Sequence, residues 1–401
     1  MTRTPTKEVF QVHNNYIKEL LGFKDVKIKK IEDHKTSITI HIETKQTSHI
    51  CPCCGNHTSK VHDYRIQTVK DMPILFKHTL LKIRKRRYKC KYCGKQFYEK
   101  IPFLSKYYRT TSRLTQYVFD ELKTVTSMKQ IAQKANISNT TVSSRFDLIN
   151  YSLNKLPSVL SIDEFRGNAG GEKYQCFLVD AEHHKALDVL PNRSLESLCE
   201  YFKKFNDRDK VRILIMDMWR PYYDIARTYF KNALIVIDKY HYVRQNTWAF
   251  ESIRKREQNR LGKYATKIFK GSRKILLSNP NKLSNEEKMQ LNAILSFSED
   301  LRQGYCLKQM FYEFSNSTPY KEAKPLLSKF ILLAQNSDIP EYIKLANTLL
   351  NWSEEILNSF RVPYTNGVIE GMNNKIKVIK RNAYGVRNFN RFRNSILHCF
   401  N

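Results

Sequence analysis

The stretch Val159-Leu-Ser-Ile-Asp-Glu-Phe165 decides how the second half of this chain folds. It has the apolar and β-branched residues of a buried strand, and it carries an acid, Asp163, inside the run. A glycine-rich turn at Gly167–Gly171 follows, and then two more strand-like runs, Tyr174–Val179 and Ala186–Leu190. We therefore predict a meander of three strands.

Helices and strands alternate after this meander. We expect a helix at Ser194–Phe205, a strand at Val211–Asp217, a helix at Pro221–Phe230, a strand at Ala233–Ile237 that ends at Asp238, and a long helix through Arg254. The order β-β-β-α-β-α-β-α is that of a ribonuclease-H-like mixed sheet, in which the first and fourth strands are neighbours.

Two acids should meet in such a sheet. Asp163 lies within the first strand and Asp217 ends the fourth, and an acid in an apolar strand is costly unless its charge is compensated. Two carboxylates on adjacent strands repel each other, and a divalent cation relieves that repulsion. As alternatives, Asp217 caps a helix, Asp163 pairs with a lysine, or Asp180 or Asp188 replaces either acid.

A third acid comes from the stretch Tyr364–Lys380, where a helix is expected to begin near Asn366-Gly367. Glu370 is a lone acid beside amides and lysines, which is unusual for a solvated face. With Asp163 and Asp217 it could hold two Mg2+ ions, with Mn2+ as a substitute. Its neighbours on the helix are candidates for gripping DNA: Asn373, Asn374 and Lys377.

The composition indicates a polyanionic partner. The chain has 401 residues, enough for several domains, and a formal net charge of +31. A membrane surface is the rival polyanion, but no apolar run reaches the ~18 residues of a membrane span, and no signal peptide is visible. We expect a soluble cytoplasmic protein that binds double-stranded DNA.

Five of the nine cysteines fall between Cys51 and Cys93, in two C-x-x-C-G knuckles. Such knuckles predict a structural zinc site with four thiolate ligands and no open position. Cys53 is a possible substitute ligand, and unrelated thiols or a redox pair are the alternatives. The predicted ligands are Cys51, Cys54, Cys90 and Cys93.

Two further segments indicate DNA contact. The basic strand Thr79–Lys89 fits a cationic rim for phosphates, or else a solvated edge strand guarded by lysines. Residues 127–146 have a helix-turn-helix pattern with Ser138 as the second N-cap, although helical hairpins share this spacing. The exposed side of the second helix should carry Asn139, Thr140, Ser143, Ser144 and Arg145.

These motifs together resemble the DDE transposases of bacterial insertion sequences, in the subgroup with an N-terminal zinc ribbon and helix-turn-helix. The resemblance rests on the cysteine knuckles and on four stretches: 161–165, 215–218, 236–241 and 366–377. It implies that Asp163, Asp217 and Glu370 form the catalytic triad. It also implies nucleoid association in a bacterium and a dimer or larger assembly on DNA.

Relatives with a long insertion before the glutamate carry a motif similar to Asp238-Lys-Tyr-His241. Asp238 and His241 are therefore auxiliary candidates for positioning the DNA or the nucleophile, with a capping Asp and a packed His as the alternative. Trp248 and Trp352 bracket the insertion. We expect both to pack in a core, with stacking on an unpaired base as the alternative.

The expected fold is a multidomain α+β and α/β chain. Its parts are an N-terminal region with a zinc ribbon (1–99), a helix-turn-helix domain (100–155), the first part of the catalytic core (156–245), an α-helical insertion (246–360) and the core completion with a basic C-terminal segment (361–401). This arrangement predicts a transposase that cleaves and joins DNA ends by a two-metal mechanism. Its rivals are a DNA-binding regulator with an inactive core and a structure-specific nuclease.

Overall fold

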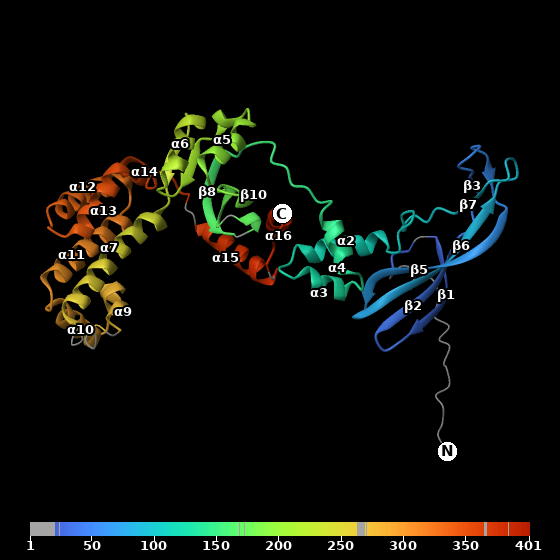
Figure 1. The fold of residues 1–401 in the computed structure, drawn as a ribbon, viewed down its shortest axis with the longest axis horizontal. Coiled ribbons are helices and arrows are strands. Elements are labelled where there is room, and N and C mark those ends of the chain that lie inside the picture. The colour runs from blue at the N-terminus through green and yellow to red at the C-terminus, as the bar shows by residue number, and fades with distance from the viewer. Residues whose placement is uncertain are drawn as a thin grey trace, which may run out of the picture. The chain divides into compact units, whose positions relative to one another are not determined.

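The computed structural model describes residues 21–23, 25–167, 169–171, 173–262, 269, 271–364, 367–383 and 385–401. The sequence also predicts a short amphipathic helix over residues 5–21, which lies outside the described residues except for Leu21. The chain divides into two compact units, Met1–Asn150 and Tyr151–Asn401, which are described separately (Figure 1).

The first unit is built on a five-stranded sheet. Its main path is β1-β2-β6-β5, and β7 also pairs with β6. A separate two-stranded sheet joins β3 to β4. The strands are β1 (Val26–Asp33), β2 (Ser37–Thr44), β3 (His49–Ile50), β4 (His57–Thr58), β5 (Val61–Ile74), β6 (Lys77–Lys89) and β7 (Gln96–Tyr98).

Strand β6 lies inside the sheet, because it pairs in parallel with β2 and antiparallel with β5. The alternative that Thr79–Lys89 is a solvated edge strand is therefore wrong. Most of its arginines have partners in the same unit: Arg84 lies 3.7 Å from the ring centroid of Tyr64, and Arg87 donates to Asp63 at 2.6 Å. Because these arginines of β6 already have partners, only part of the strand's positive charge is available to a ligand.

Beside the sheet, the described part of the first unit has three helices: α2 (Ser112–Leu122), α3 (Met128–Lys134) and α4 (Asn139–Phe146). Ser138 caps α4 by accepting a hydrogen bond from the Thr141 amide at 3.1 Å, as predicted. Ile131 and Val142 are fully buried where α3 packs against α4. The helix-turn-helix predicted from the sequence is present.

The second unit contains a mixed five-stranded sheet of order β10-β9-β8-β11-β12. Strands β8, β9 and β10 form the predicted antiparallel meander, and β11 runs parallel to both β8 and β12. The bounds are β8 (Val159–Arg166), β9 (Tyr174–Asp180), β10 (Lys185–Leu190), β11 (Ile213–Met216) and β12 (Leu234–Ile237). The first and fourth strands of this unit are neighbours, as the sequence predicted.

Helices cover both faces of this sheet. Leu160 and Ile162 of β8 share one apolar cluster with Leu198 of α5 (Leu195–Lys203) and Tyr222 of α6 (Arg220–Tyr229). On the other face, Phe165 of β8 makes an edge contact with Phe392 of α16 (Phe389–Phe400) at 6.0 Å. Helix α15 (Gly367–Asn382) reaches the same strand, because Asn373 bonds to Asp163.

A helical segment separates β12 from α15 (Figure 1). Among its described residues the helices are α7 (Lys239–Arg260), α9 (Ser272–Leu277), α10 (Asn285–Leu295), α11 (Glu299–Asn316), α12 (Tyr320–Gln335), α13 (Pro340–Asn351) and α14 (Ser353–Asn358). Short 3-10 turns also occur in this unit, at Ala169–Gly171, Arg208–Lys210 and Pro280–Lys282. Among the described residues, no helix is both long and apolar enough to cross a membrane.

Candidate active site and metal centre

Four cysteines converge in the first unit. The Sγ atoms of Cys51 and Cys93 are 3.5 Å apart, as are those of Cys54 and Cys90, and all four lie within 4.8 Å of one another. A tetrahedral zinc ion with Zn–S bonds of about 2.3 Å requires sulfur separations of roughly 3.8 Å, so the thiols fit zinc. Within the described parts of the chain, this is the one such group of three or more potential ligands.

The two knuckles share one backbone geometry. Gly55 and Gly94 both have φ of +72°, a conformation that side chains with a Cβ rarely adopt. The Gly55 amide donates to the Cys51 carbonyl at 3.0 Å, and the Gly94 amide donates to the Cys90 carbonyl at 3.1 Å. A hydrogen bond from the backbone amide of Asn56 is the largest cause that lowers the pKa of Cys54 to about 6, which favours the thiolate that binds metal.

The helix-turn-helix presents most of the predicted polar side chains to solvent. Asn139, Thr140 and Ser144 are exposed and Ser143 is half-buried. Arg145 is different, because only 7% of it is exposed and its guanidinium donates to the hydroxyl of Thr110. The prediction that Arg145 lies on the exposed side is wrong: its position on α4 turns the side chain toward the segment before α2, where the Thr110 hydroxyl accepts a hydrogen bond from the guanidinium.

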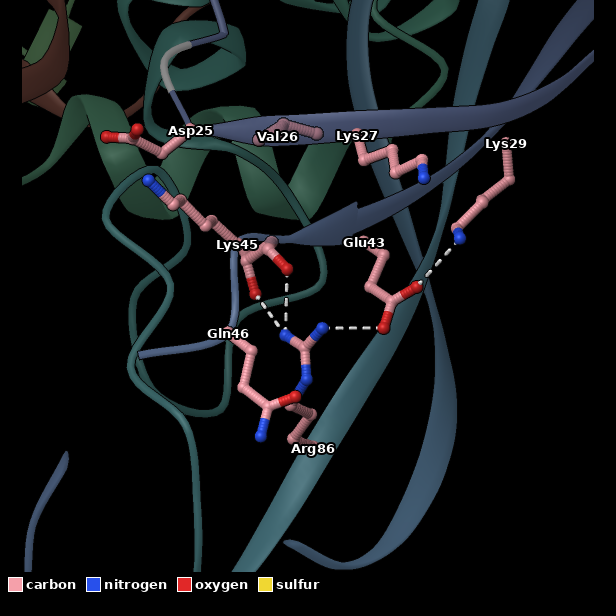
Figure 2. Close-up of a pocket in the computed structure, with 9 residues that line it drawn as sticks. Asp25, Val26, Lys27, Lys29, Glu43, Lys45, Gln46 and Arg86 are labelled. Atoms are coloured by element: carbon pink, nitrogen blue, oxygen red, sulfur yellow. Dashed lines mark hydrogen bonds and ion pairs between the residues drawn. The ribbon is translucent and has the colours of Figure 1, made fainter. Parts of the chain in front are cut away.

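A basic pocket of about 570 Å³ opens on the first sheet beside Arg86. Arg86 is buried and donates to the carboxylate of Glu43 at 2.6 Å, and Lys29 pairs with the same carboxylate at 3.4 Å (Figure 2). The exposed lysines Lys27 and Lys45 also line the pocket (Figure 2). Its excess of cations suits an anionic ligand such as a phosphate.

In the second unit, Asp163 lies near the carboxyl end of β8, on the face covered by α15. Its Oδ2 atom accepts a hydrogen bond from the Asn373 amide at 2.8 Å, and its Oδ1 atom accepts from the Glu164 backbone amide at 2.7 Å. Burial is the largest effect on its pKa and raises it to about 7, with a further increase from the charges of Glu164 and Asp238. Asn373 therefore holds an acid that is costly to ionise.

Asp217 follows directly after β11, the strand that neighbours β8. It is 9% exposed, and its Oδ1 atom is buried without a hydrogen-bond partner among the described residues. Burial first, and then the charges of Glu164 and Asp163, raise the pKa of Asp217 to about 8. The alternative that Asp217 caps α6 is wrong, because the N-cap residue of that helix is Trp219.

Asp180 and Asp188, the other acids considered, have structural partners. Asp180 accepts from the backbone amides of Glu182 and His183 at the turn after β9, both at 3.1 Å. Asp188 pairs with Arg393 at 2.5 Å, which fastens α16 to β10. Both acids are therefore occupied by these contacts, and the structure gives no reason to put either in the place of Asp163 or Asp217.

Glu370 lies in the first turn of α15 and is exposed. The structure brings Asp163 and Asp217 together, but the three predicted acids do not form one of the tight ligand groups found in the described residues. Asn374 and Lys377 are exposed farther along α15 and bond to each other at 3.1 Å. The role of Glu370 stays a prediction.

Asp238 and His241 lie at the same edge of the sheet. The Asp238 amide donates to the Met216 carbonyl at 3.0 Å, so Asp238 is adjacent to Asp217. His241 Nε2 is 3.8 Å from Asp238 Oδ2, and His241 Nδ1 is 3.3 Å from the guanidinium of Arg244. Since arginine only donates, Nδ1 must accept; burial lowers the pKa of His241 to about 4, so the ring is neutral at pH 7.

Glu164 and Arg193 were missed in the sequence. Arg193 donates to Glu164 Oε1 at 2.7 Å, while Glu164 Oε2 is buried without a partner among the described residues. Glu164 directly follows Asp163 in β8. Because side chains alternate along a strand, the Glu164 side chain is expected on the face opposite to that of Asp163. The effect of the Glu164 charge on Asp217 became visible only in the tertiary structure, where β8 and β11 lie side by side.

Comparisons with known proteins agree with this organisation. A family model described as a transposase matches residues 160–396. A model for the zinc-finger of transposase IS204/IS1001/IS1096/IS1165 matches 47–93, and one for the helix-turn-helix domain of transposase family ISL3 matches 99–150. The four cysteines lie within the zinc-finger match, which supports a structural zinc ion.

The chain is also similar to individual curated proteins. It is 26% identical over 387 residues to the transposase for insertion sequence element IS1001 of Bordetella parapertussis, covering 91% of this chain and 92% of that one. It is 29% identical over 128 residues to the transposase for IS1557 of Mycobacterium tuberculosis, covering 32% and 29%. A Lactococcus lactis protein named as an ATP-dependent protease is 35% identical over 107 residues, covering 27% and 33%.

Proposed function

Because the chain belongs to the ISL3 family of transposases, we propose that it binds the terminal inverted repeats of an insertion sequence and catalyses Mg2+-dependent cleavage and strand transfer at those ends. One observation carries the proposal: the neighbouring strands β8 and β11 place Asp163 and Asp217 so close together that the charge of Asp163 contributes to the raised pKa of Asp217. The bacterial nucleoid, which holds the substrate, is the proposed location.

The proposed core is ribonuclease-H-like. The support is the strand order β10-β9-β8-β11-β12, with an antiparallel meander followed by two parallel strands. Ligands of such sheets bind at the carboxyl ends of the parallel strands, and Asp217 and Asp238 follow β11 and β12 there. On this view 156–245 and 361–401 make the core and 246–360 is an insertion.

We assign end recognition to residues 1–155, the predicted zinc-ribbon and helix-turn-helix domains. Matches to a transposase zinc-finger and helix-turn-helix support DNA as the partner. Short polar side chains on α4 suit base edges in a major groove, and the lysines around the pocket beside Arg86 suit the phosphate backbone. The residues proposed to read the repeat are Asn139, Thr140, Ser143 and Ser144.

In the proposed active site, Asp163, Asp217 and Glu370 would hold two Mg2+ ions. Carboxylate oxygens suit this hard cation, and a cation would compensate the charge of the buried Asp217 carboxylate. When bound, the metal pair polarises the scissile phosphate, activates the nucleophile and stabilises the leaving 3′ oxygen. Glu370 would be the third ligand, because it lies in the first turn of the helix whose Asn373 bonds to Asp163.

Side chains around the acids would position the reactants. Asn373 keeps the Asp163 carboxylate facing the site by its 2.8 Å hydrogen bond. Asn374 and Lys377 are exposed on the same helix, where an amide and an ammonium can contact the strand being cut. Asp238 and His241 are proposed to orient the DNA or the nucleophile, since His241 is neutral and faces Asp238.

The direct experiment uses purified protein, Mg2+ and DNA from the flanks of its own gene. We expect end-specific cleavage and joining of the new 3′ ends to target DNA. Asp163→Asn, Asp217→Asn and Glu370→Gln should each abolish cleavage and leave end binding intact, because the recognition residues lie in the other unit. Asp224→Asn, at a half-buried acid on α6 paired with Arg220, is the matched control.

The rival functions predict different results in the same assay. End binding without cleavage at any divalent-ion concentration would favour a DNA-binding regulator. Cleavage of branched DNA without need for the repeats would favour a structure-specific nuclease. Because a transposase must hold two ends together, we also propose a dimer or larger assembly on DNA, measurable by light scattering of the protein–end complex.

A further inference from the structure

Helix α7 carries an exposed aromatic and basic stack on its first turns. Tyr240 and Trp248 are 53% and 52% exposed, and Arg244 lies between them in the sequence at helical i, i+4, i+8 spacing. The Arg244 guanidinium carbon is 5.1 Å from the ring centroid of Tyr240 and 4.6 Å from that of Trp248. The three side chains therefore form one surface feature, the α7 stack.

Packing does not explain this surface. The opposite side of α7 supplies the core residues Tyr242, Phe250 and Ile253, all fully buried. Trp352, by contrast, packs partly buried against the main core and makes an edge contact with Tyr223 at 5.4 Å. We expected both tryptophans to pack in a core. The structure confirms this for Trp352 and shows that it is wrong for Trp248.

The stack starts at the candidate active site. Asp238 precedes α7 and bonds through its amide to Met216, the residue before Asp217. With a helical rise of 1.5 Å per residue, Trp248 lies roughly 15 Å along the axis from Asp238. That length corresponds to about four base steps of DNA at 3.4 Å each.

Arg244 connects the stack to the acids. Its guanidinium faces His241 Nδ1 at 3.3 Å, and the other ring nitrogen of His241 faces Asp238 at 3.8 Å. The Arg244 Nε atom is buried and has no hydrogen-bond partner among the described residues. The guanidinium is thus held in place between two rings, and the Arg244 side chain is half-buried.

We propose that the α7 stack binds an unpaired nucleobase of the DNA beside the cleaved bond, with the base on Trp248 and its phosphate on Arg244. This inference rests on the proposed function, which supplies DNA as the substrate. Aromatic rings with interleaved arginine are the chemistry that holds single-stranded nucleic acid, since every base offers a flat face and every nucleotide a phosphate. A purely apolar partner would gain nothing from the cation between the rings.

The test compares two DNA probes that carry the element end. One is fully paired, and the other has a single unpaired nucleotide placed at successive positions within four bases of the cut. Wild-type protein should bind the unpaired probe more tightly at one position. Trp248→Ala should reduce that preference about tenfold or more, the loss expected for one base–aromatic stack, and should bind the paired probe as wild type does.

Three controls make the outcome decisive. Trp248→Phe should restore most of the preference, because it keeps an aromatic ring. Phe297→Ala, at an exposed ring outside α7, should change nothing. Equal melting temperatures for all variants exclude a folding defect.

An unchanged preference in Trp248→Ala would overturn the proposal. So would a change of oligomeric state in that variant, measured by light scattering without DNA, since the α7 stack would then be an interface between copies. A wild-type protein that binds neither probe would instead refute the proposed function, and with it this site.

Discussion

At the scale of single residues, Asp163 and Asp217 have the clearest effect on stability, because ionising either carboxylate in the folded protein is costly. Their pKa values of about 7 and about 8 arise first from burial and then from neighbouring acids. Folding therefore binds protons, and the ionised pair opposes the fold above these pKa values. Such a strained pair of acids is common at functional sites, where stability is given up for activity.

A pH-dependent gain in stability should follow from Asp217→Asn. The unfolded Asp ionises near its ordinary pKa of 3.8, while the folded Asp stays protonated up to about 8. The penalty is therefore absent below pH 3.8, grows as the pH rises and is complete above pH 8. Removing it should raise the free energy of unfolding by on the order of a few kcal/mol at pH 8 and by little near pH 4.

Denaturant unfolding in buffer without divalent ions, at pH 4 and pH 8, measures this effect. Asp224→Asn serves again as the control, because that acid is paired with Arg220 and lies on α6, outside the candidate active site. A variant at Asp217 that is less stable than wild type at pH 8 would show that the carboxylate stabilises the fold instead.

At the scale of elements, the two cysteine knuckles together form one metal site. One knuckle lies between β3 and β4, and the other lies between β6 and β7, so a shared ion joins segments distant in the sequence. Four thiolates within 4.8 Å would repel one another without a cation. The metal therefore stabilises this end of the sheet directly.

The identity of the zinc ligands can be tested with matched cysteine variants. Cys54→Ser and Cys90→Ser should lose the one bound zinc ion per chain and expose the region around the knuckles to protease. Cys53→Ser should keep the ion, because Cys53 is exposed and is not one of the four converging thiols. Atomic absorption on purified protein gives the zinc content; loss of zinc from Cys53→Ser would assign that thiol as a ligand.

At the scale of the whole molecule, the charge of +31 sets how the chain meets DNA. Part of the positive charge is used internally, as in the pairs Arg86–Glu43 and Arg393–Asp188. The exposed remainder is available to release counterions from DNA phosphates. Affinity for any duplex should therefore depend strongly on salt.

Raising the salt from about 50 to about 200 mM should weaken binding to a duplex of unrelated sequence by about 10³-fold or more, as expected for several phosphate contacts. Fluorescence anisotropy titrations at each salt concentration give the slope. A neutral osmolyte at matched osmolality is the control. A nearly flat dependence would mean that the basic residues are not in contact with the phosphates.

The sequence by itself determined the elements and their order. Strand periodicity in Val159–Phe165 and the helix signals around Ser138 and Gly367 are local, so the strands, α4 and α15 lie where they were predicted. The same holds for the cysteine knuckles, since a turn with glycine at positive φ is fixed by a few adjacent residues. The adjacency of β8 and β11 followed from the rules of chain connection.

Only the tertiary structure decided which side chains face inward and which acids meet. Arg145 and Trp248 have ordinary helical positions, but the first is buried against Thr110 and the second is exposed beside Arg244. Glu164 lies near Asp217, and Glu370 remains exposed on α15. The physical reason is that burial and charge proximity depend on packing between elements far apart in the chain, which periodicity within one element does not specify.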